Sequence, residues 1–187
     1  MLTKTQRLVE VLLLATIITA MVTGISTAQP IQVVADIYGC SDMSIQGSAK
    51  LKERFSEEGV KVVDVTINMM GLSPGKHAVH IHETGTCEPC GAAGGHFDPG
   101  PDSNPSPDGN HPFHSGDLIN IDVNAGGAGA LHTNTTRVTL SSGPLSLFDA
   151  DGSSIIIHDN PDTYCPDGNT AGCAGGSRAA CGILRLK

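Results

Sequence analysis

Several of the eight histidines of this chain of 187 residues lie at spacings that suit a metal ion. His80 and His82 occupy alternate positions in the segment HAVHIHE, and residues i and i+2 of a β-strand face the same side. Two imidazoles that project together from a rigid strand suit copper or zinc. The pair alone does not define a metal site, so the other histidines decide the question.

Further imidazoles and one carboxylate follow along the chain. His96 stands in GGHFDP, His111 and His114 precede Asp117 in HPFHSGDL, and His158 ends the apolar run SSIIIH. Imidazole nitrogens together with one carboxylate oxygen form a ligand set that favours copper and zinc over calcium or magnesium. This set is too large to be a collection of surface or purely structural histidines.

Short strands are the elements that must position these side chains. Segments that are rich in β-branched residues, or that alternate apolar with polar residues, cover 31–38, 44–52, 60–69, 77–83, 117–123, 129–133, 136–141, 153–158 and 181–186. Turn residues separate them, and no long stretch after the N-terminal segment has a helical period. The pattern predicts an all-β sandwich or barrel of about eight strands.

Two long segments, 84–116 and 159–180, interrupt this rhythm and are rich in glycine and proline. Loops of that length in a compact domain are usually functional or disordered. Both contain cysteines, and the first also contains three histidines, which disordered linkers rarely have. We therefore expect two ordered loops that are pinned over a site.

The N-terminal segment has the features of a signal peptide. Lys4 and Arg7 make its start basic, residues 11–22 are apolar, and a Ser-Thr-Ala sequence follows. The apolar run is too short for a membrane span of about 20 residues, although an uncleaved anchor is the alternative. We expect a signal peptide over 1–28, a single domain over 29–187, and export to a periplasm or to the extracellular space.

The six cysteines fit an exported protein. An even number behind an export signal predicts disulfides; they are Cys40, Cys87, Cys90, Cys165, Cys173 and Cys181. The C-x-x-C pair of Cys87 and Cys90 could instead be half of a zinc site, but the chain has no second such pair. The formal net charge of −8 argues against nucleic acid or an anionic membrane as a partner.

The motifs HAVHIHETGTC, GGHFDP, HSGDL, GSSIIIHDNPD and GGSRAACGI make residues 31–187 similar to the copper,zinc superoxide dismutase family, in its exported bacterial form. The resemblance implies a Greek-key β-sandwich or flattened barrel of antiparallel strands with two long functional loops. It also implies disproportionation of superoxide, a small anionic substrate, with copper and zinc as cofactors. A homodimer is one possible oligomeric state of such a protein.

The resemblance assigns roles at matching positions. The implied metal ligands are His80, His82 and His158 for copper, His96 as the imidazolate shared by both metals, and His114 and Asp117 for zinc. Asp162 would link a copper ligand to a zinc ligand, since carboxylates commonly orient ligand imidazoles. Arg178 would lie beside the copper and attract the anionic substrate.

The sequence departs from the family pattern at the zinc site. The family usually places its third zinc histidine about eight residues after the bridging one, and here that position is Asn104. We expect His111 to take its place, although it lies only three residues before His114. A weakened or absent zinc site is the alternative. The rival functions are therefore a copper-only dismutase and a non-catalytic module for copper binding or delivery.

The family disulfide would join Cys181 to the first long loop, and the spacing in exported members favours Cys87 over Cys90 as its partner. Cys165 and Cys173 should pair within the second loop, and a Cys40–Cys90 bond stays open. The second loop contains no lysine. Since lysines there commonly guide superoxide inward in the family, we expect weaker electrostatic steering.

Overall fold

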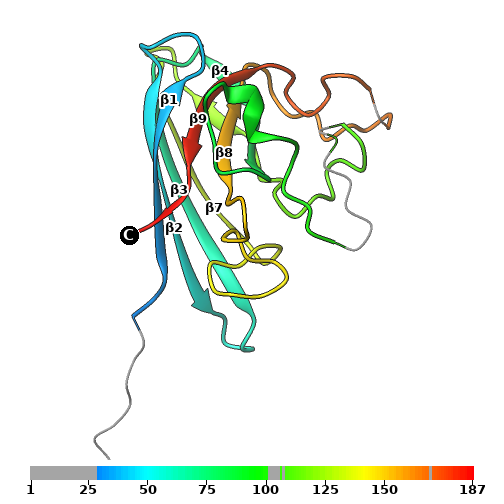
Figure 1. Ribbon diagram of the computed structural model, residues 1–187. Coiled ribbons are helices and arrows are strands. Elements are labelled where there is room, and N and C mark those ends of the chain that lie inside the picture. The colour runs from blue at the N-terminus through cyan, green and yellow to red at the C-terminus, as the bar shows by residue number, and fades with distance from the viewer. Residues whose placement is uncertain (1–28, 101–105, 107, 169) are drawn as a thin grey trace, which may run out of the picture.

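The computed structural model describes residues 29–100, 106, 108–168 and 170–187 (Figure 1). The expected signal peptide, 1–28, and Asn104 lie outside the described residues. Within the described part the chain forms strands and one short 3-10 helix, η1 (Cys90–Ala93), and contains no α-helix. No helix there is long and apolar enough to cross a membrane.

Ten strands form one antiparallel sheet. They are β1 (Gln32–Gly39), β2 (Gln46–Phe55), β3 (Lys61–Met70), β4 (Gly75–His77), β5 (Val79–His82), β6 (Ile121–Val123), β7 (Gly129–Thr135), β8 (Ser154–His158), β9 (Arg178–Ile183) and β10 (Arg185–Leu186). Their order is β4-β6-β7-β3-β2-β1-β9-β8-β5, and β10 pairs with β1.

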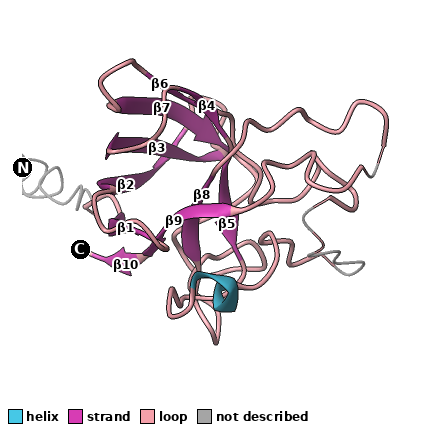
Figure 2. Cartoon of the chain, turned by 90° about the horizontal axis from the view of Figure 1, so that it is seen from above, coloured by secondary structure: helices cyan, strands magenta, loops and turns pink. Residues whose placement is uncertain are grey.

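The two edge strands of this sheet are neighbours in the sequence. β4 and β5 are the outermost strands of the order, yet only Ala78 separates them in the sequence. The sheet therefore curls until it is nearly closed into a barrel, as the view from above shows (Figure 2). The predicted all-β class is confirmed, and the arrangement is consistent with a Greek-key barrel.

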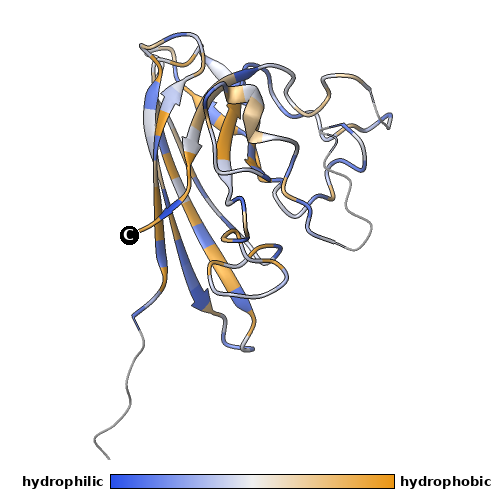
Figure 3. Ribbon diagram, in the orientation of Figure 1, coloured by the Kyte–Doolittle hydropathy of each residue, from blue (hydrophilic) through white to orange (hydrophobic). Residues whose placement is uncertain are grey.

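The core lies inside the barrel and follows from the alternation in the long strands. The alternation of apolar and polar residues along the long strands is visible in Figure 3. Val33, Ile37, Leu51, Val65 and Ile67 are buried at alternating positions of these strands. Burial of each such side chain contributes about 1.5–3 kcal/mol. These strands form the rigid wall from which the shorter strands β5 and β8 project their histidines.

β8 is buried on both faces, which explains its unbroken run of isoleucines. Ile155 and Ile157 belong to the main core. Ile156 points the other way, into a second cluster with Ala93 and Cys181. The first long loop, which contains η1, therefore covers the outside of the strand that carries His158.

Four strand predictions differ from the structure, and two of them, 77–83 and 181–186, differ in that each segment is divided between two strands. The segment 136–141 does not form a strand, although Val138 and Leu140 are buried. Its backbone instead donates to the carboxylate of Glu53, from the N–H groups of Leu140 at 2.7 Å and Ser141 at 3.0 Å. The segment 117–123 forms a strand only from Ile121 onward, because its first residues pass beside β5 instead.

Candidate metal centre

The first long loop is held against the outer edge of β5, so the histidines of both are fixed relative to each other. Phe97 donates its N–H to the carbonyl of Ile81 at 2.9 Å, and Ile81 donates to the carbonyl of Gly116 at 2.8 Å. Leu118 donates to Val79 at 3.3 Å. The loop thus passes β5 twice and supplies the partners that an edge strand lacks.

Four imidazoles form a first cluster, which consists of His80, His82, His96 and His158. One donor nitrogen from each lies within 4.8 Å of the others, and all four residues are buried. The Nδ1 atom of His80 and the Nε2 atom of His158 are 3.2 Å apart. Pairing of β5 with β8 places them together, because His80 lies opposite Ile156 in the register.

The nitrogens of the first cluster have the features of a metal site. Nε2 of His82 and Nε2 of His96 are buried and have no hydrogen-bond partner among the described residues. A buried polar atom left unpaired costs about 1–3 kcal/mol, which a bound cation would offset. The donor set therefore fits a copper ion.

Backbone carbonyls anchor the other nitrogens of two of these rings. Nδ1 of His82 lies 3.0 Å from the carbonyl oxygen of Gly94, and Nδ1 of His158 lies 2.9 Å from that of Gly176. Each ring nitrogen donates there, which leaves Nε2 as the lone-pair donor. Both long loops thus orient the first cluster.

The carboxylate of Asp117 gathers a second cluster, which consists of His96, His111, His114 and Asp117. Its Oδ1 lies 2.7 Å from Nδ1 of His96, and its Oδ2 lies 3.1 Å from Nδ1 of His111 and 3.1 Å from Nδ1 of His114. The His111 atom forms no hydrogen bond despite this distance. Nitrogen and carboxylate donors suit zinc.

The second cluster is less compact around His114 than around the other residues. The tightest set of donor atoms at this carboxylate consists of His80, His96, His111 and Asp117, within 4.8 Å of one another. His114 contacts the same carboxylate, and its backbone N–H also donates to Oδ2 at 2.9 Å. His111 therefore reaches the carboxylate despite its shifted position in the sequence.

Asp162 joins the two clusters from outside. Its Oδ2 lies 3.0 Å from Nε2 of His80 and 2.7 Å from Nε2 of His111. The side-chain amide of Asn120 donates to the Asp162 carbonyl at 3.0 Å, and its oxygen accepts the Asp162 N–H at 2.8 Å. The sequence analysis missed Asn120, whose only signal is its place three residues after Asp117.

The electrostatics divide the site into two halves. Burial lowers the pKa of His80 to about 3 and that of His158 to about 4, so these rings are neutral and offer lone pairs near pH 7. Burial also opposes protonation of His111, but Asp117 and Asp162 outweigh it and raise its pKa to about 9. In the metal-free protein the imidazole of His111 is therefore protonated near pH 7, at a position where the two carboxylates favour a cation.

Arg178 lies beside the first cluster. Its guanidinium donates to the carbonyl oxygens of Cys90 and Gly94, and the Gly94 oxygen also contacts His82. Burial lowers the pKa of Arg178, but an arginine keeps its charge in a protein. The positive charge in turn contributes to the lowered pKa values of His82 and His158, after burial.

Disulfides and one carboxylate tie the long loops down. The structure forms Cys87–Cys181 and Cys165–Cys173, the two expected pairs, and also Cys40–Cys90. Asp108 joins the loops to each other, since its carboxylate accepts the N–H groups of Gly172 at 2.9 Å and Ala174 at 3.2 Å. Figure 1 shows both loops, green and orange, on the same side of the sheet.

Two histidines lie outside both clusters. His77 is buried, with Nδ1 at 2.7 Å from the carbonyl of His158 and Nε2 at 2.8 Å from that of Ser73. It therefore supports the backbone that carries a member of the first cluster. His132 is exposed on β7, where its Nδ1 lies 3.3 Å from the hydroxyl of Thr66.

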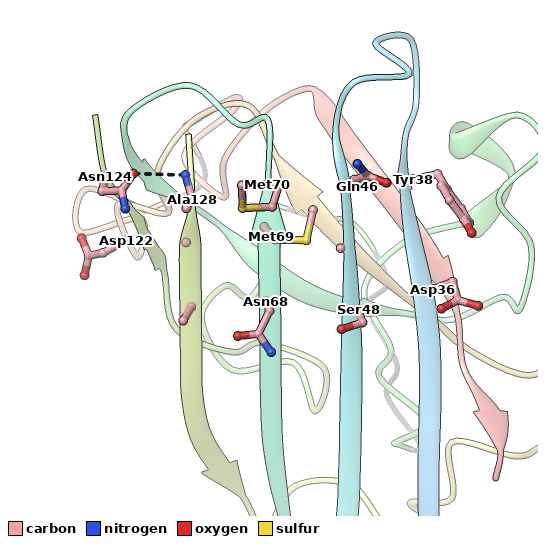
Figure 4. Close-up of a pocket in the computed structure, with 13 residues that line it drawn as sticks. Asp36, Tyr38, Gln46, Ser48, Asn68, Met69, Met70, Asp122, Asn124 and Ala128 are labelled. Atoms are coloured by element: carbon pink, nitrogen blue, oxygen red, sulfur yellow. Dashed lines mark hydrogen bonds between the residues drawn. The ribbon is translucent and has the colours of Figure 1, made fainter. Parts of the chain in front are cut away.

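A broad hollow of about 770 Å³ on the outer face of the sheet contains none of these histidines (Figure 4). Asp36, Tyr38, Gln46, Asn68 and Asp122 are among its lining residues. Because the charged side chains in its lining are the carboxylates of Asp36 and Asp122, the hollow does not suit an anionic substrate. The buried clusters are the better candidate for chemistry.

A nearly closed β-barrel with two adjoining histidine clusters defines a metal-binding protein of the all-β class. A sequence model of the copper/zinc superoxide dismutase family matches residues 45–184. The chain is also 40% identical over 135 residues to a superoxide dismutase [Cu-Zn] of Deinococcus radiodurans, covering 65% of this chain and 69% of that protein. The chain belongs to the copper/zinc superoxide dismutase family.

A solved structure agrees with this assignment at the level of the fold. The crystal structure of the clock protein EA4 matches with a TM-score of 0.64 and 24% identity, over 88% of this chain and 100% of that one. At that identity the likeness shows the shared fold alone.

Proposed function

We infer that this protein is a superoxide dismutase, which converts two superoxide anions and two protons into oxygen and hydrogen peroxide. Membership of the family carries the reaction and the use of copper and zinc. One observation supports the way in which this chain performs the reaction. The buried ring of His96 belongs to both groups of candidate ligands, with Nδ1 on Asp117 and Nε2 free of any hydrogen bond among the described residues.

The copper ligands that we propose are Nδ1 of His80 and the Nε2 atoms of His82, His96 and His158. Their second ring nitrogens contact Asp162, Gly94, Asp117 and Gly176, respectively. Such contacts fix each ring and its tautomer. Copper bound there supplies the electron transfer of the reaction.

For zinc we propose Nδ1 of His96, His111 and His114 with the carboxylate of Asp117. The support is the convergence of all three nitrogens on this carboxylate, at 2.7 to 3.1 Å. The contact of His111 with Asp162 favours a complete zinc site over a copper-only protein, because it turns Nδ1 of His111 toward Asp117.

We propose that Arg178 and His96 act directly on the substrate. The guanidinium of Arg178, oriented by two carbonyls, attracts and positions a small anion beside the first cluster. Nε2 of His96 is buried without a hydrogen-bond partner. It is the atom placed to hold a proton and pass it to the reduced substrate, while Asp117 keeps Nδ1 in place.

Export is part of the same proposal. The described cysteines all form disulfides, which persist in oxidising compartments. Together with the N-terminal signal pattern, this supports a periplasmic or extracellular enzyme.

Metal analysis together with a dismutation assay tests this function. We expect about one copper and one zinc per chain, with activity that a chelator removes and added copper restores. His82→Ala should lose copper and activity, whereas His132→Ala, at an exposed histidine, should lose neither. Turnover with copper alone would indicate a copper-only dismutase, and bound copper without turnover a delivery module.

A further inference from the structure

We propose that Arg137 is a positioning residue for the zinc half of the site, because its guanidinium holds both ends of the segment 112–117. Nη1 of Arg137 donates to the carbonyl oxygen of Pro112 at 3.1 Å, and Nη2 donates to the carbonyl oxygen of Asp117. The inference rests on the proposed zinc site, but nothing in the family assignment requires this arginine.

The segment that Arg137 contacts has little regular structure of its own. It lies between β5 and β6, and Asp117 forms only an isolated bridge with His80. Inside the segment, His114 and Asp117 bond to each other: the N–H of Asp117 donates to the His114 carbonyl at 3.2 Å, and the N–H of His114 donates to the Asp117 carboxylate. The bond from the N–H of Ile81 to the carbonyl of Gly116 ties the end of this segment to β5, but these bonds do not tie its start, at Pro112, to a strand.

Arg137 adds a second connection to the barrel, from Pro112 and Asp117 to the chain just after β7. Its own N–H donates to the hydroxyl of Thr135 at 3.1 Å, at the end of β7. The next residue, Val138, is fully buried in the main core. The guanidinium therefore projects from a stretch of chain that is fixed at both sides.

The chemistry of an arginine suits this task. A guanidinium is a planar fork that stays charged and carries several N–H donors in fixed directions. It can therefore hold two carbonyls at a set separation, whereas a lysine offers a single flexible point of attachment. Fixing the carbonyls of Pro112 and Asp117 fixes the backbone beside His111 and the carboxylate that His96 and His114 contact.

The displaced histidine explains why this chain needs such a support. His111 and His114 are only three residues apart, and both must turn Nδ1 toward the same carboxylate. The intervening backbone therefore has to curl tightly. A clamp across Pro112 and Asp117 keeps that curl in place when no metal is bound.

Zinc affinity of the copper-free protein tests the role of Arg137. Arg137→Met removes the fork and keeps the length of the side chain, and we expect zinc affinity to fall about 10-fold to 100-fold, as it does when groups behind a ligand are lost. The zinc affinity of Arg137→Lys should lie between those of Arg137→Met and the wild type. The matched control is Arg54→Met, which removes an equal charge from the exposed Arg54–Asp64 pair and should leave the affinity unchanged.

A second measurement separates positioning from general stability. Cobalt(II) bound in place of zinc reports ligand geometry through its visible absorption, so Arg137→Met should alter the spectrum while Arg54→Met preserves it. Copper affinity at the first cluster should change much less than zinc affinity. If Arg137→Met does not fold, Arg137→Lys decides the question by the same two readouts.

Three results would overturn the inference. Wild-type zinc affinity and cobalt spectrum in the Arg137 variants would show that the clamp has no role. Equal losses of zinc and copper affinity would show a general structural effect. If the wild-type protein itself binds no zinc, the proposed zinc site fails and takes this inference with it, whereas the first two results leave the proposed function intact.

Discussion

Nδ1 of His96 lies 2.7 Å from Oδ1 of Asp117, and both side chains are buried. The opposite nitrogen of the same ring, Nε2, is buried and has no hydrogen-bond partner among the described residues, and the ring belongs to both groups of candidate metal ligands. One imidazole thus has a nitrogen in each half of the site. The proposed chemistry depends on this placement.

Asp162→Asn should weaken the zinc site more than the copper site. The carboxylate of Asp162 contacts Nε2 of both His80 and His111, but His80 is also held in β5, whereas His111 lies in a loop. We expect zinc affinity to fall about 10-fold to 100-fold, measured by competition with a chelator. Asp159→Asn, at an exposed neighbour, is the control, and an equal loss in both variants would contradict this account.

Breaking the Cys40–Cys90 disulfide should reduce turnover more than metal binding. The carbonyl of Cys90 accepts a hydrogen bond from Arg178, and the N–H of Cys40 donates to the carbonyl of Ala179 at 2.8 Å. The double variant Cys40→Ser, Cys90→Ser should therefore lower kcat/KM about 10-fold through misplacement of Arg178.

The control for this prediction is the double variant Cys165→Ser, Cys173→Ser, which removes a disulfide that does not contact Arg178. Copper and zinc content should match the wild type in the Cys40 and Cys90 variant. An unchanged kcat/KM there would show that the disulfide does not position the arginine.

Electrostatic steering should be weak. The second long loop carries the exposed carboxylates of Asp159 and Asp167 and no lysine, while Asp162 is buried. Salt screens attraction between substrate and protein, so kcat/KM should change little with ionic strength. Asp167→Lys should raise kcat/KM at low salt and make its fall with salt steeper. A steep fall in the wild type would refute the prediction.

Glu53 should stabilise the metal-free barrel in a manner that depends on pH. Burial alone would raise the pKa of Glu53, but hydrogen bonds from Ser141 and Leu140 and the charge of Lys61 outweigh it and lower the pKa. A folded-state pKa below the unfolded value means that the stabilisation is present above the unfolded value of 4.5 and is lost as pH falls through the folded pKa.

The test compares Glu53→Gln with the wild type by urea unfolding. We expect the variant to lose about 1–3 kcal/mol in the free energy of unfolding at pH 7, and the difference to shrink in acid. Glu57→Gln, in the exposed turn after β2, is the control. If the difference in unfolding free energy between Glu53→Gln and the wild type stays constant from pH 7 to well below the pKa of Glu53, this carboxylate does not provide the pH-dependent stabilisation.

The sequence predicted those elements whose residue pattern depends on their own segment alone. Alternation in residues 31–38 and 60–69 reflects a strand with one buried face, and the structure forms β1 and β3 there. The spacing of His80 and His82 likewise reflects one strand. The role of His111 was expected because the family's usual position holds Asn104, which left His111 as the nearest histidine.

The parts that were missed depend on contacts between distant segments. The segment 136–141 alternates like a strand, yet Glu53 in β2 takes its N–H groups. The chain of 77–83 is divided between the two edges of the sheet because the barrel must close there. Asn120 and Arg137 contact residues of other loops, so the place of Asn120 near Asp117 is the only local signal that either residue offers.

Anomalous diffraction from crystals of the protein loaded with both metals tests the central claim most directly. Data collected at the copper and zinc absorption edges locate each element separately. The account predicts a copper ion bound by Nε2 of His96 with His80, His82 and His158, and a zinc ion bound by Nδ1 of His96 beside Asp117. Fully loaded crystals in which His96 contacts only one metal, or neither, would contradict it.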